Sequence, residues 1–218
     1  GSREKRMDVP VAFVKSVTNI VKKYAPKDFI VGYRISPEEI HGKNIGYTWQ
    51  EATQLIDHLT KEFNLDYIHL SMLKYDSKPG DPLMDREQAD QKFNDSAKPY
   101  ATLFKPYLNG AKEIIVGSIT SKEDAEKALA LADLVAVGRE NLIDPLFADK
   151  VLNGHADEVI TTLTAAQAKA SHLTQGLIDT FSAPQLGIPI NRSDDLKTLH
   201  EGFGAWTEMK YPQNDQMK

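Results

Sequence analysis

Two glycine-containing pairs stand where short apolar runs end, and one of them includes an arginine. Gly117-Ser118 ends the first run, and Gly138-Arg139 ends the second. Glycine at a strand end lets a ligand approach the backbone closely, and the amides of a following helix N-terminus point toward it. The guanidinium of Arg139 suits a phosphate. The pattern predicts an anion site, although two tight turns and a surface arginine would give the same sequence.

A second cation lies inside an apolar run. Residues 29–36, Phe-Ile-Val-Gly-Tyr-Arg-Ile-Ser, are almost continuously apolar, as a buried parallel strand is, and Arg34 is their one charge. Burying a charge is costly unless it is paired or meets a ligand. Arg34 is therefore expected to point into an active-site mouth at the end of a barrel strand. A structural salt bridge is the alternative.

Two weaker candidates follow. His69 alternates with Tyr67 in the apolar run 66–71, so both should face one side of a strand, and a structural role for His69 is the simpler interpretation. The polar stretch 72–96 contains Lys74 and Tyr75. A loop this long carries function or is a mobile surface segment.

Strands and helices alternate along the chain and would position these residues. Strands are predicted at 29–35, 66–71, 113–117 and 133–137, and the helices at 7–24, 98–109, 141–154 and 164–181. Two more helices start with capping patterns, Thr48 with Glu51 and Ser121 with Asp124. Repeated βα units predict an α/β fold with a parallel sheet and right-handed crossovers.

Four βα units make half of a closed TIM (βα)8 barrel, in which the loops after the last two strands hold phosphate. Such a half leaves two sheet edges open, which favours association. We expect a further half, or a second copy of the chain, to close the barrel. The predicted domains are a half-barrel with the phosphate side at 1–157 and a helical and irregular extension packing on it at 158–218.

The composition excludes several classes of protein. The chain has 218 residues, 41% hydrophobic, with a net charge of −5, so no basic field for nucleic acid is expected. It has no cysteine, which rules out disulfides and thiolate metal sites and fits a cytoplasmic location. No metal site and no membrane span are predicted.

Four segments are similar to motifs of one enzyme family. Residues 1–7 are similar to a segment written GSxENR, with Lys5 in place of Asn, and residues 31–37 are similar to a strand-five motif with a flavin-contacting Arg. Residues 116–120 are similar to a strand-seven glycine motif in which Ser118 replaces a common second Gly, and residues 132–145 to a strand-eight Gly-Arg motif. Together they resemble the C-terminal half of old yellow enzyme-type NADH:flavin oxidoreductases, the FMN-dependent ene-reductases.

The resemblance implies a function. FMN would be the cofactor, with Arg34 at the flavin ring and Gly117, Ser118, Gly138 and Arg139 at its phosphate. NAD(P)H would reduce FMN, which would pass hydride to an electron-poor alkene or similar small-molecule acceptor. The family's His-His or His-Asn pair and its tyrosine donor map outside this chain, so no catalytic residue is predicted and the chain alone should be weak or inactive.

Two other functions remain open from the sequence. One is a different phosphate-binding TIM-barrel enzyme of aldolase or lyase type, with Arg34 holding a substrate carboxylate. The other is a non-catalytic half-barrel stabilised by oligomerisation.

Overall fold

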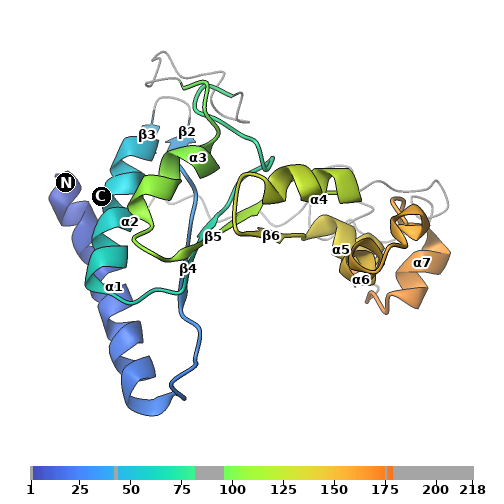
Figure 1. Cartoon of the computed structure of the whole chain (residues 1–218), viewed down its shortest axis with the longest axis horizontal. Helices are drawn as coiled ribbons and strands as arrows, with labels where there is room; N and C mark the ends of the chain where they lie inside the picture. The colour runs from blue at the N-terminus through green and yellow to red at the C-terminus, as the bar shows by residue number, and fades with distance from the viewer. Residues whose placement is uncertain (1, 42–43, 82–95, 175, 179–218) are drawn as a thin grey trace, which may run out of the picture. The chain divides into compact units, whose positions relative to one another are not determined.

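The computed structural model describes residues 2–41, 44–81, 96–174 and 176–178 (Figure 1). Their contacts divide the chain into two units, residues 1–137 and residues 138–218. We describe each unit by itself. The predicted division at 157/158 separates a barrel from its extension, and it stays a prediction.

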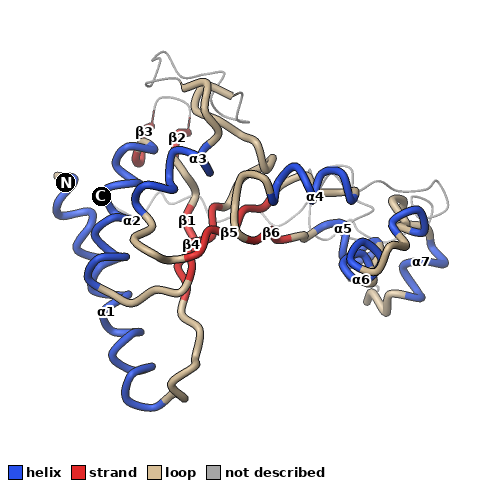
Figure 2. The backbone as a smooth tube through the Cα atoms, viewed as in Figure 1, coloured by secondary structure: helices blue, strands red, loops and turns tan. Residues whose placement is uncertain are grey.

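The first unit is built on a parallel sheet of four strands (Figure 2). Their order is β1 (Gly32–Ile35), β4 (Tyr67–Leu70), β5 (Lys112–Val116) and β6 (Leu134–Ala136). All four predicted strands are confirmed, each within a few residues. Because the strands run in one direction, their carboxyl ends meet at one edge, so the loops after β1, β4 and β5 are neighbours.

One face of this sheet is covered and the other is only partly covered. Ile68, Leu70 and Ile115 are fully buried on the covered face. Alternate residues, among them His69 and Ile114, are half-buried on the opposite face. Half of a barrel would show this difference in burial between the two faces, because helices would cover its outer face and its interior face would be open.

Helices α2 (Trp49–Glu62) and α4 (Lys122–Leu129) begin where the capping patterns predict. The side chain of Thr48 accepts a hydrogen bond from the Glu51 amide, and the Glu51 carboxylate accepts one from the Thr48 amide. These reciprocal bonds satisfy amides that the first helical turn leaves unpaired. Local sequence therefore sets where the helices after β1 and β5 start.

Helix α1 (Arg3–Tyr24) is longer than the predicted 7–24. Ser2 is its N-cap, and the Ser2 hydroxyl accepts a hydrogen bond from the Lys5 amide at 3.4 Å. The predicted start was wrong because the first turn is polar, and the apolar spacing that indicates a helix begins only at Met7. Pro10 therefore lies inside the helix rather than in its first turn.

A hairpin lies in the segment 37–48, which the sequence analysis left without strands. It pairs β2 (Glu39–His41) with β3 (Asn44–Tyr47) in antiparallel fashion. Tyr47 fixes the hairpin to the end of β1, because its hydroxyl donates to the Ser36 carbonyl at 3.0 Å. Strands of three and four residues are too short for a periodic pattern to reveal.

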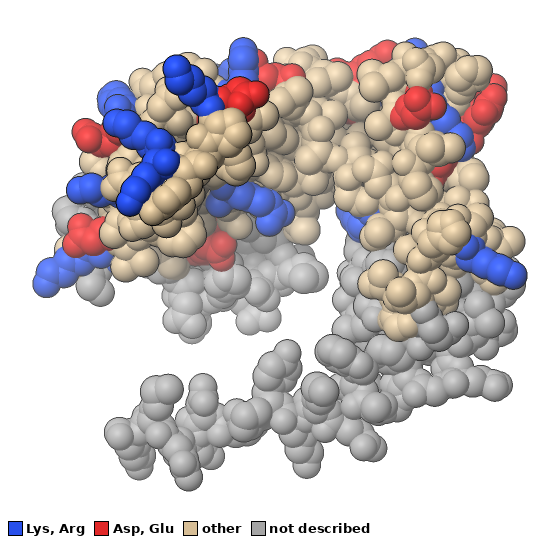
Figure 3. Space-filling model, turned by 90° about the horizontal axis from the view of Figure 1, so that it is seen from below, with Lys and Arg blue, Asp and Glu red and all other residues tan. Residues whose placement is uncertain are grey.

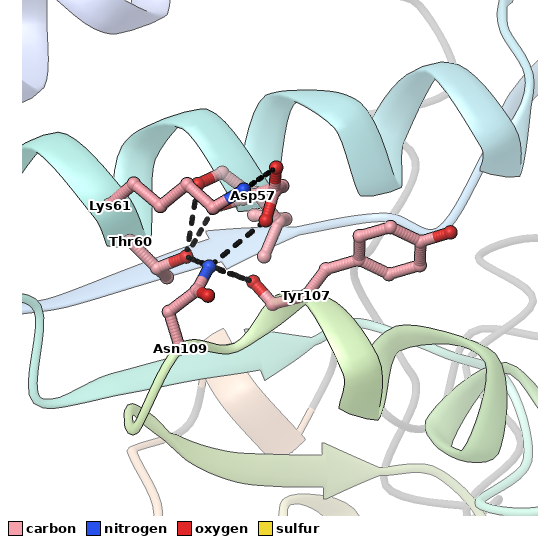
Figure 4. Close-up of polar contacts among 6 residues, drawn as sticks. Asp57, Thr60, Lys61, Tyr107 and Asn109 are labelled. Atoms are coloured by element: carbon pink, nitrogen blue, oxygen red, sulfur yellow. Dashed lines mark hydrogen bonds and ion pairs between the residues drawn. The ribbon is translucent and has the colours of Figure 1, made fainter.

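A polar cluster holds the opposite, amino edge of the sheet (Figure 4). Asn109 Nδ2 donates to Asp57 Oδ1 at 3.0 Å and to Thr60 Oγ1 at 2.9 Å, joining α2 to the turn before β5. Lys61 Nζ pairs with Asp57 Oδ2 at 2.6 Å. Asn109 adopts a left-handed φ of 47°, which ends the helical segment that precedes it.

The predicted helix 98–109 is accordingly shorter. It consists of α3 (Tyr100–Phe104) and the 3-10 turn η2 (Lys105–Tyr107). Tyr100, Ala101 and Phe104 of α3 are buried, so its apolar face packs as predicted. Pro106 lies within this turn. Because proline has no amide hydrogen, a continuous α-helix through position 106 would lose a backbone hydrogen bond.

The second unit contains α5 (Arg139–Ile143), α6 (Phe147–Leu152) and α7 (Ala165–Ala170), with the 3-10 turn η3 (Ala156–Glu158), and residues 176–178 are also helical. The single helix predicted at 141–154 is wrong, since α5 and α6 are separate. Asp144 is buried at the break, and its carboxylate accepts bonds from Lys150 Nζ at 2.7 Å and the Ile160 amide at 2.9 Å. Pro145 ends α5 here, because it has no amide to donate and disfavours a helical backbone at Asp144. The bonds of the Asp144 carboxylate anchor this break to the rest of the unit.

A small hydrophobic core holds the second unit together. Ile143, Leu163, Ala168 and Ile178 are buried together. Of the predicted helix 164–181, residues 165–170 (α7) and 176–178 are helical, residues 171–174 are not, and residue 175 and those from 179 onward lie outside the described part.

No helix in the described ranges is long and apolar enough to cross a bilayer. Basic and acidic side chains both appear on the face drawn in Figure 3.

Candidate functional site

Arg34 lies near the carboxyl end of β1 with an exposed side chain. Its Nη2 atom donates a hydrogen bond of 2.7 Å to the hydroxyl of Ser71, the residue directly after β4. That partner is neutral, and within the described part of the chain no ion pair to Arg34 is seen. The guanidinium is therefore held in place at the strand ends while keeping its charge for an anionic group.

His69 is the direct neighbour of Arg34 across the sheet, in register on β4. Burial and the charge of Arg34 both lower the pKa of His69. Its Nε2 atom is buried and has no hydrogen-bond partner among the described residues. At neutral pH His69 is therefore uncharged, and Arg34 is not repelled by a second cation.

A cleft of about 710 Å³ opens beside Arg34, large enough for a cofactor-sized ligand. Its walls come from α1, β1, the hairpin, α2 and the residue after β4, and they include Arg6, Tyr33, Arg34, Tyr47, Glu51 and Ser71. Arg6 Nη2 lies 3.1 Å from Glu51 Oε1 and links the two helices at the rim. Burial raises the pKa of Tyr33, so its phenol stays protonated and can donate a hydrogen bond.

Gly117 follows β5 with φ of 133°, a conformation that favours glycine. A Cβ atom at this position would lie 2.6 Å from the Lys74 amide nitrogen, so the loop after β4 occupies that space. The Tyr75 amide donates to the Gly117 carbonyl at 3.0 Å. The requirement for glycine here thus has a cause within the chain itself, and amide donation from Gly117 to a phosphate stays a prediction.

Ser118 adopts φ of 50°, rare for a residue other than glycine. Its hydroxyl donates to the Leu73 carbonyl at 2.8 Å, which ties the turn after β5 to the loop after β4. A glycine at this position would have no hydroxyl to make that bond. Ser118 therefore contributes a tether between the two loops, and donation from its amide to a phosphate stays a prediction.

The described beginning of the loop 72–96 packs against this turn. Tyr75 is buried, and Lys74 Nζ forms an exposed ion pair of 3.0 Å with Asp76 Oδ2. Residues 82–95 of the same stretch lie outside the described residues. Lys74 and Tyr75 are thus brought to the edge where Gly117 lies.

Gly138 and Arg139 open α5 in the second unit. Gly138 is exposed, and an added Cβ would meet nothing within 4 Å, so its backbone is open to a ligand. Arg139 is half-buried at the first helical position. Because the two residues belong to the second unit, their meeting with Gly117 at one phosphate stays a prediction.

Two buried carboxyl groups with raised pKa values were missed by the sequence analysis. Glu113 is completely buried in β5, and burial raises its pKa to about 8, with Asp133 adding to the increase and Lys105 opposing it. Glu140 is buried beside Arg139 in sequence, and burial followed by the charge of Asp144 raises its pKa to about 7. Glu113 stands within the apolar run Lys-Glu-Ile-Ile-Val, the one signal that could have identified it.

The chain was compared with known proteins. The family model described as NADH:flavin oxidoreductase / NADH oxidase matches residues 1–158. A probable NADH-dependent flavin oxidoreductase of Bacillus subtilis is 34% identical over 193 residues, 87% of this chain and 48% of the relative. An NADH:acrylate oxidoreductase of Vibrio harveyi is 31% identical over 160 residues, 70% of this chain and 14% of the relative.

An NADH:fumarate oxidoreductase of Klebsiella pneumoniae is 27% identical over 184 residues, 81% of this chain and 18% of the relative. The chain therefore spans about half the length of the Bacillus relative and smaller shares of the other two. The family implies a TIM barrel, of which the parallel sheet of the first unit is a part. The resemblance seen in the sequence is confirmed, and the chain belongs to the NADH:flavin oxidoreductase / NADH oxidase family, the FMN- and NADH-dependent enzymes of the old yellow enzyme type.

Proposed function

We propose that the chain forms the phosphate side of an FMN-dependent NAD(P)H oxidoreductase that in intact form reduces an electron-poor alkene or similar acceptor. The observation that carries the proposal is the charge of Arg34, exposed at the carboxyl edge of the sheet and fixed by Ser71 beside a cofactor-sized cleft. The names of two relatives contain acrylate and fumarate, both alkenes conjugated to carboxylate.

The residues present fit a flavin phosphate and a ring that gains negative charge. Gly138 leaves open space at its Cα, and Arg139 follows it with a cation. Gly117 and Ser118 would add backbone amides, as the family resemblance implies. Bound FMN would supply the hydride chemistry, and Arg34 would stabilise the negative charge of the reduced ring.

The chain by itself is expected to be weakly active or inactive. The residues that polarise the acceptor and donate its proton in this family have no counterpart here. His69, the histidine nearest Arg34, is kept neutral by burial and by that charge, and its position in β4 suits packing inside a barrel. A further half-barrel, or a second copy of the chain, would have to complete the enzyme at the sheet edges.

Equilibrium titration with FMN, followed by quenching of flavin fluorescence, tests the proposal. Arg34→Met and Arg139→Ala should each weaken binding about tenfold or more, because each removes a cation from the ligand. Lys112→Ala is the matched control, since it removes an exposed cation at the amino edge of the sheet. Equal affinities for wild type and both arginine variants would refute the assignment.

Spectroscopy separates the other two functions. An aldolase or lyase would bind a phosphorylated substrate and would show no flavin absorbance. In that case Arg34→Met would lower the affinity for that substrate and leave FMN binding unaffected. A non-catalytic half-barrel would bind neither ligand. The membership of the chain in a flavin-dependent family favours the first proposal over both.

A further inference from the structure

The turn after β5 and the loop after β4 are in direct backbone contact. A Cβ atom added to Gly117 would lie 2.6 Å from the amide nitrogen of Lys74 and 2.8 Å from the carbonyl oxygen of Leu73. The strands that lead into these segments are neighbours, since Leu70 of β4 is in register with Ile115 of β5. Both segments therefore leave the sheet at its carboxyl edge, and each limits where the other can lie.

Two hydrogen bonds cross this contact in opposite directions. The Ser118 hydroxyl donates to the Leu73 carbonyl at 2.8 Å, and the Tyr75 amide donates to the Gly117 carbonyl at 3.0 Å. A backbone anion site works by facing amide donors toward the ligand, and carbonyl oxygens there would repel an anion. The two bonds engage two of these oxygens within the protein, which favours an anion at the turn.

The same loop segment also contacts Arg34. Ser71, two residues before Leu73, accepts the hydrogen bond of 2.7 Å from Arg34 Nη2. Residues 71–75, which we call the brace, therefore contact Arg34 at one end and the turn at the other. Gly117 and Ser118, which we call the phosphate turn, are thus connected to Arg34 through five consecutive residues.

The brace is itself anchored by the residues that follow it. Tyr75 is 6% exposed, and the hydroxyl of the buried Ser77 accepts a bond from the Lys74 amide at 3.3 Å. The Ser77 carbonyl accepts a bond of 2.9 Å from the amide of Tyr100, the first residue of α3. The brace is therefore a fixed support, and a broken bond at Ser118 should release the phosphate turn from it.

The backbone of Ser118 is in a conformation that favours another residue. Its φ of 50° lies in the left-handed region, which glycine adopts without strain and serine does not. Glycine is also the common residue at this position of the similar strand-seven motif. A strained residue that persists where an unstrained one is available points to a use for its side chain.

Resting on the proposed function, we propose that Ser118 is a positioning residue, whose hydroxyl holds the phosphate turn at a fixed place relative to Arg34 by means of the brace. The ligand that it serves is a flavin with a terminal phosphate, which places its phosphate at the turn and its ring at Arg34. The hydroxyl is used by Leu73, so Ser118 acts by placing the backbone of the turn.

Titration with two flavins tests this role. Riboflavin has the ring of FMN and lacks the phosphate. Ser118→Gly relieves the strained φ and Ser118→Ala keeps Cβ, and both remove the hydroxyl. Each should weaken FMN binding about fivefold or more, the effect of one hydrogen bond, and riboflavin binding by less than about twofold. Ser16→Ala is the matched control, because it removes an exposed hydroxyl-to-carbonyl bond of 2.8 Å within α1.

Amide hydrogen exchange, followed by NMR without ligand, tests the tether separately. The Tyr75 amide, bonded to the Gly117 carbonyl, should exchange about fivefold faster or more in both Ser118 variants. The Tyr100 amide, bonded to Ser77, should keep its rate, because the brace stays anchored. An unchanged rate at Tyr75, or equal acceleration at both amides, overturns the proposal.

The binding results have distinct meanings. Weaker FMN binding in Ser118→Gly alone would assign the effect to backbone flexibility, and equal losses for FMN and riboflavin would place it away from the phosphate; either result contradicts the role of the hydroxyl. A wild-type chain that binds no FMN refutes the proposed function and this inference together. A wild-type chain that binds FMN as both variants do refutes the inference alone.

Discussion

Arg34 on β1 and Ser71 after β4 are joined by a hydrogen bond of 2.7 Å from Nη2 to Oγ. The two residues are 37 positions apart, and only the parallel pairing of β1 with β4 brings them together. The bond fixes the direction of the one charge in β1. Its removal should therefore change ligand binding more than stability.

Ser71→Ala should weaken FMN binding about threefold to tenfold, because a hydrogen bond to a charged group is worth ~1 kcal/mol when partly exposed. Ser71→Thr keeps a hydroxyl and should bind nearly as wild type. Titration of both variants, with thermal unfolding in parallel, makes the comparison. Equal loss in the two variants would mean that the side-chain volume at position 71 matters and the hydroxyl does not.

Gly117→Ala should destabilise the first unit by about 2–3 kcal/mol, since it combines an unfavourable φ with a backbone clash. Gly110→Ala is the matched control, because Gly110 has φ of 99° but open space around its Cα. It should cost only about 1 kcal/mol. Chemical denaturation measures both, and identical costs would show that the Lys74 backbone yields to the added methyl group.

Variants of Asn109 test how much the polar cluster at the amino edge of the sheet contributes to stability. Asn109→Gly keeps the left-handed turn and loses the bonds to Asp57 and Thr60, so it should cost about 1 kcal/mol. Asn109→Ala adds the strain of a left-handed alanine and should cost about 1 kcal/mol more. Neither variant should alter FMN affinity, because the cluster lies opposite the site. A fall in affinity with unchanged stability would contradict that placement.

Glu113 should make stability depend on pH. Its folded pKa is raised to about 8 from 4.5, so between these values the folded chain binds the proton more tightly than the unfolded chain. The stabilisation from this group is complete below pH 4.5 and falls as the pH rises toward 8, by an amount on the order of 5 kcal/mol.

Glu113→Gln isolates this contribution. The variant should be more stable than wild type near pH 8, and the difference should shrink as pH falls toward 5. Chemical denaturation from pH 5 to 8.5 measures it. Glu140 titrates in the same direction within the second unit, so Glu140→Gln serves as the comparison that shows which unit is affected. A difference that stays constant with pH would exclude a buried, protonated Glu113.

Local signals in the sequence predicted the parts of the fold that depend on neighbouring residues. Short apolar runs predicted all four strands of the sheet, and side-chain caps predicted the starts of α2 and α4. The same motifs identified the family. These signals are local because a cap or a turn is completed within a few residues.

Features that depend on residues far apart in the chain became visible only in the folded structure. Gly117 is required by the backbone of Leu73 and Lys74, which the sequence analysis did not connect with it. Phe13 and Ile20 of α1 are exposed, and their exposure depends on where the sheet ends. Local spacing predicts that a face is apolar, but burial is set by the surface that packs against that face.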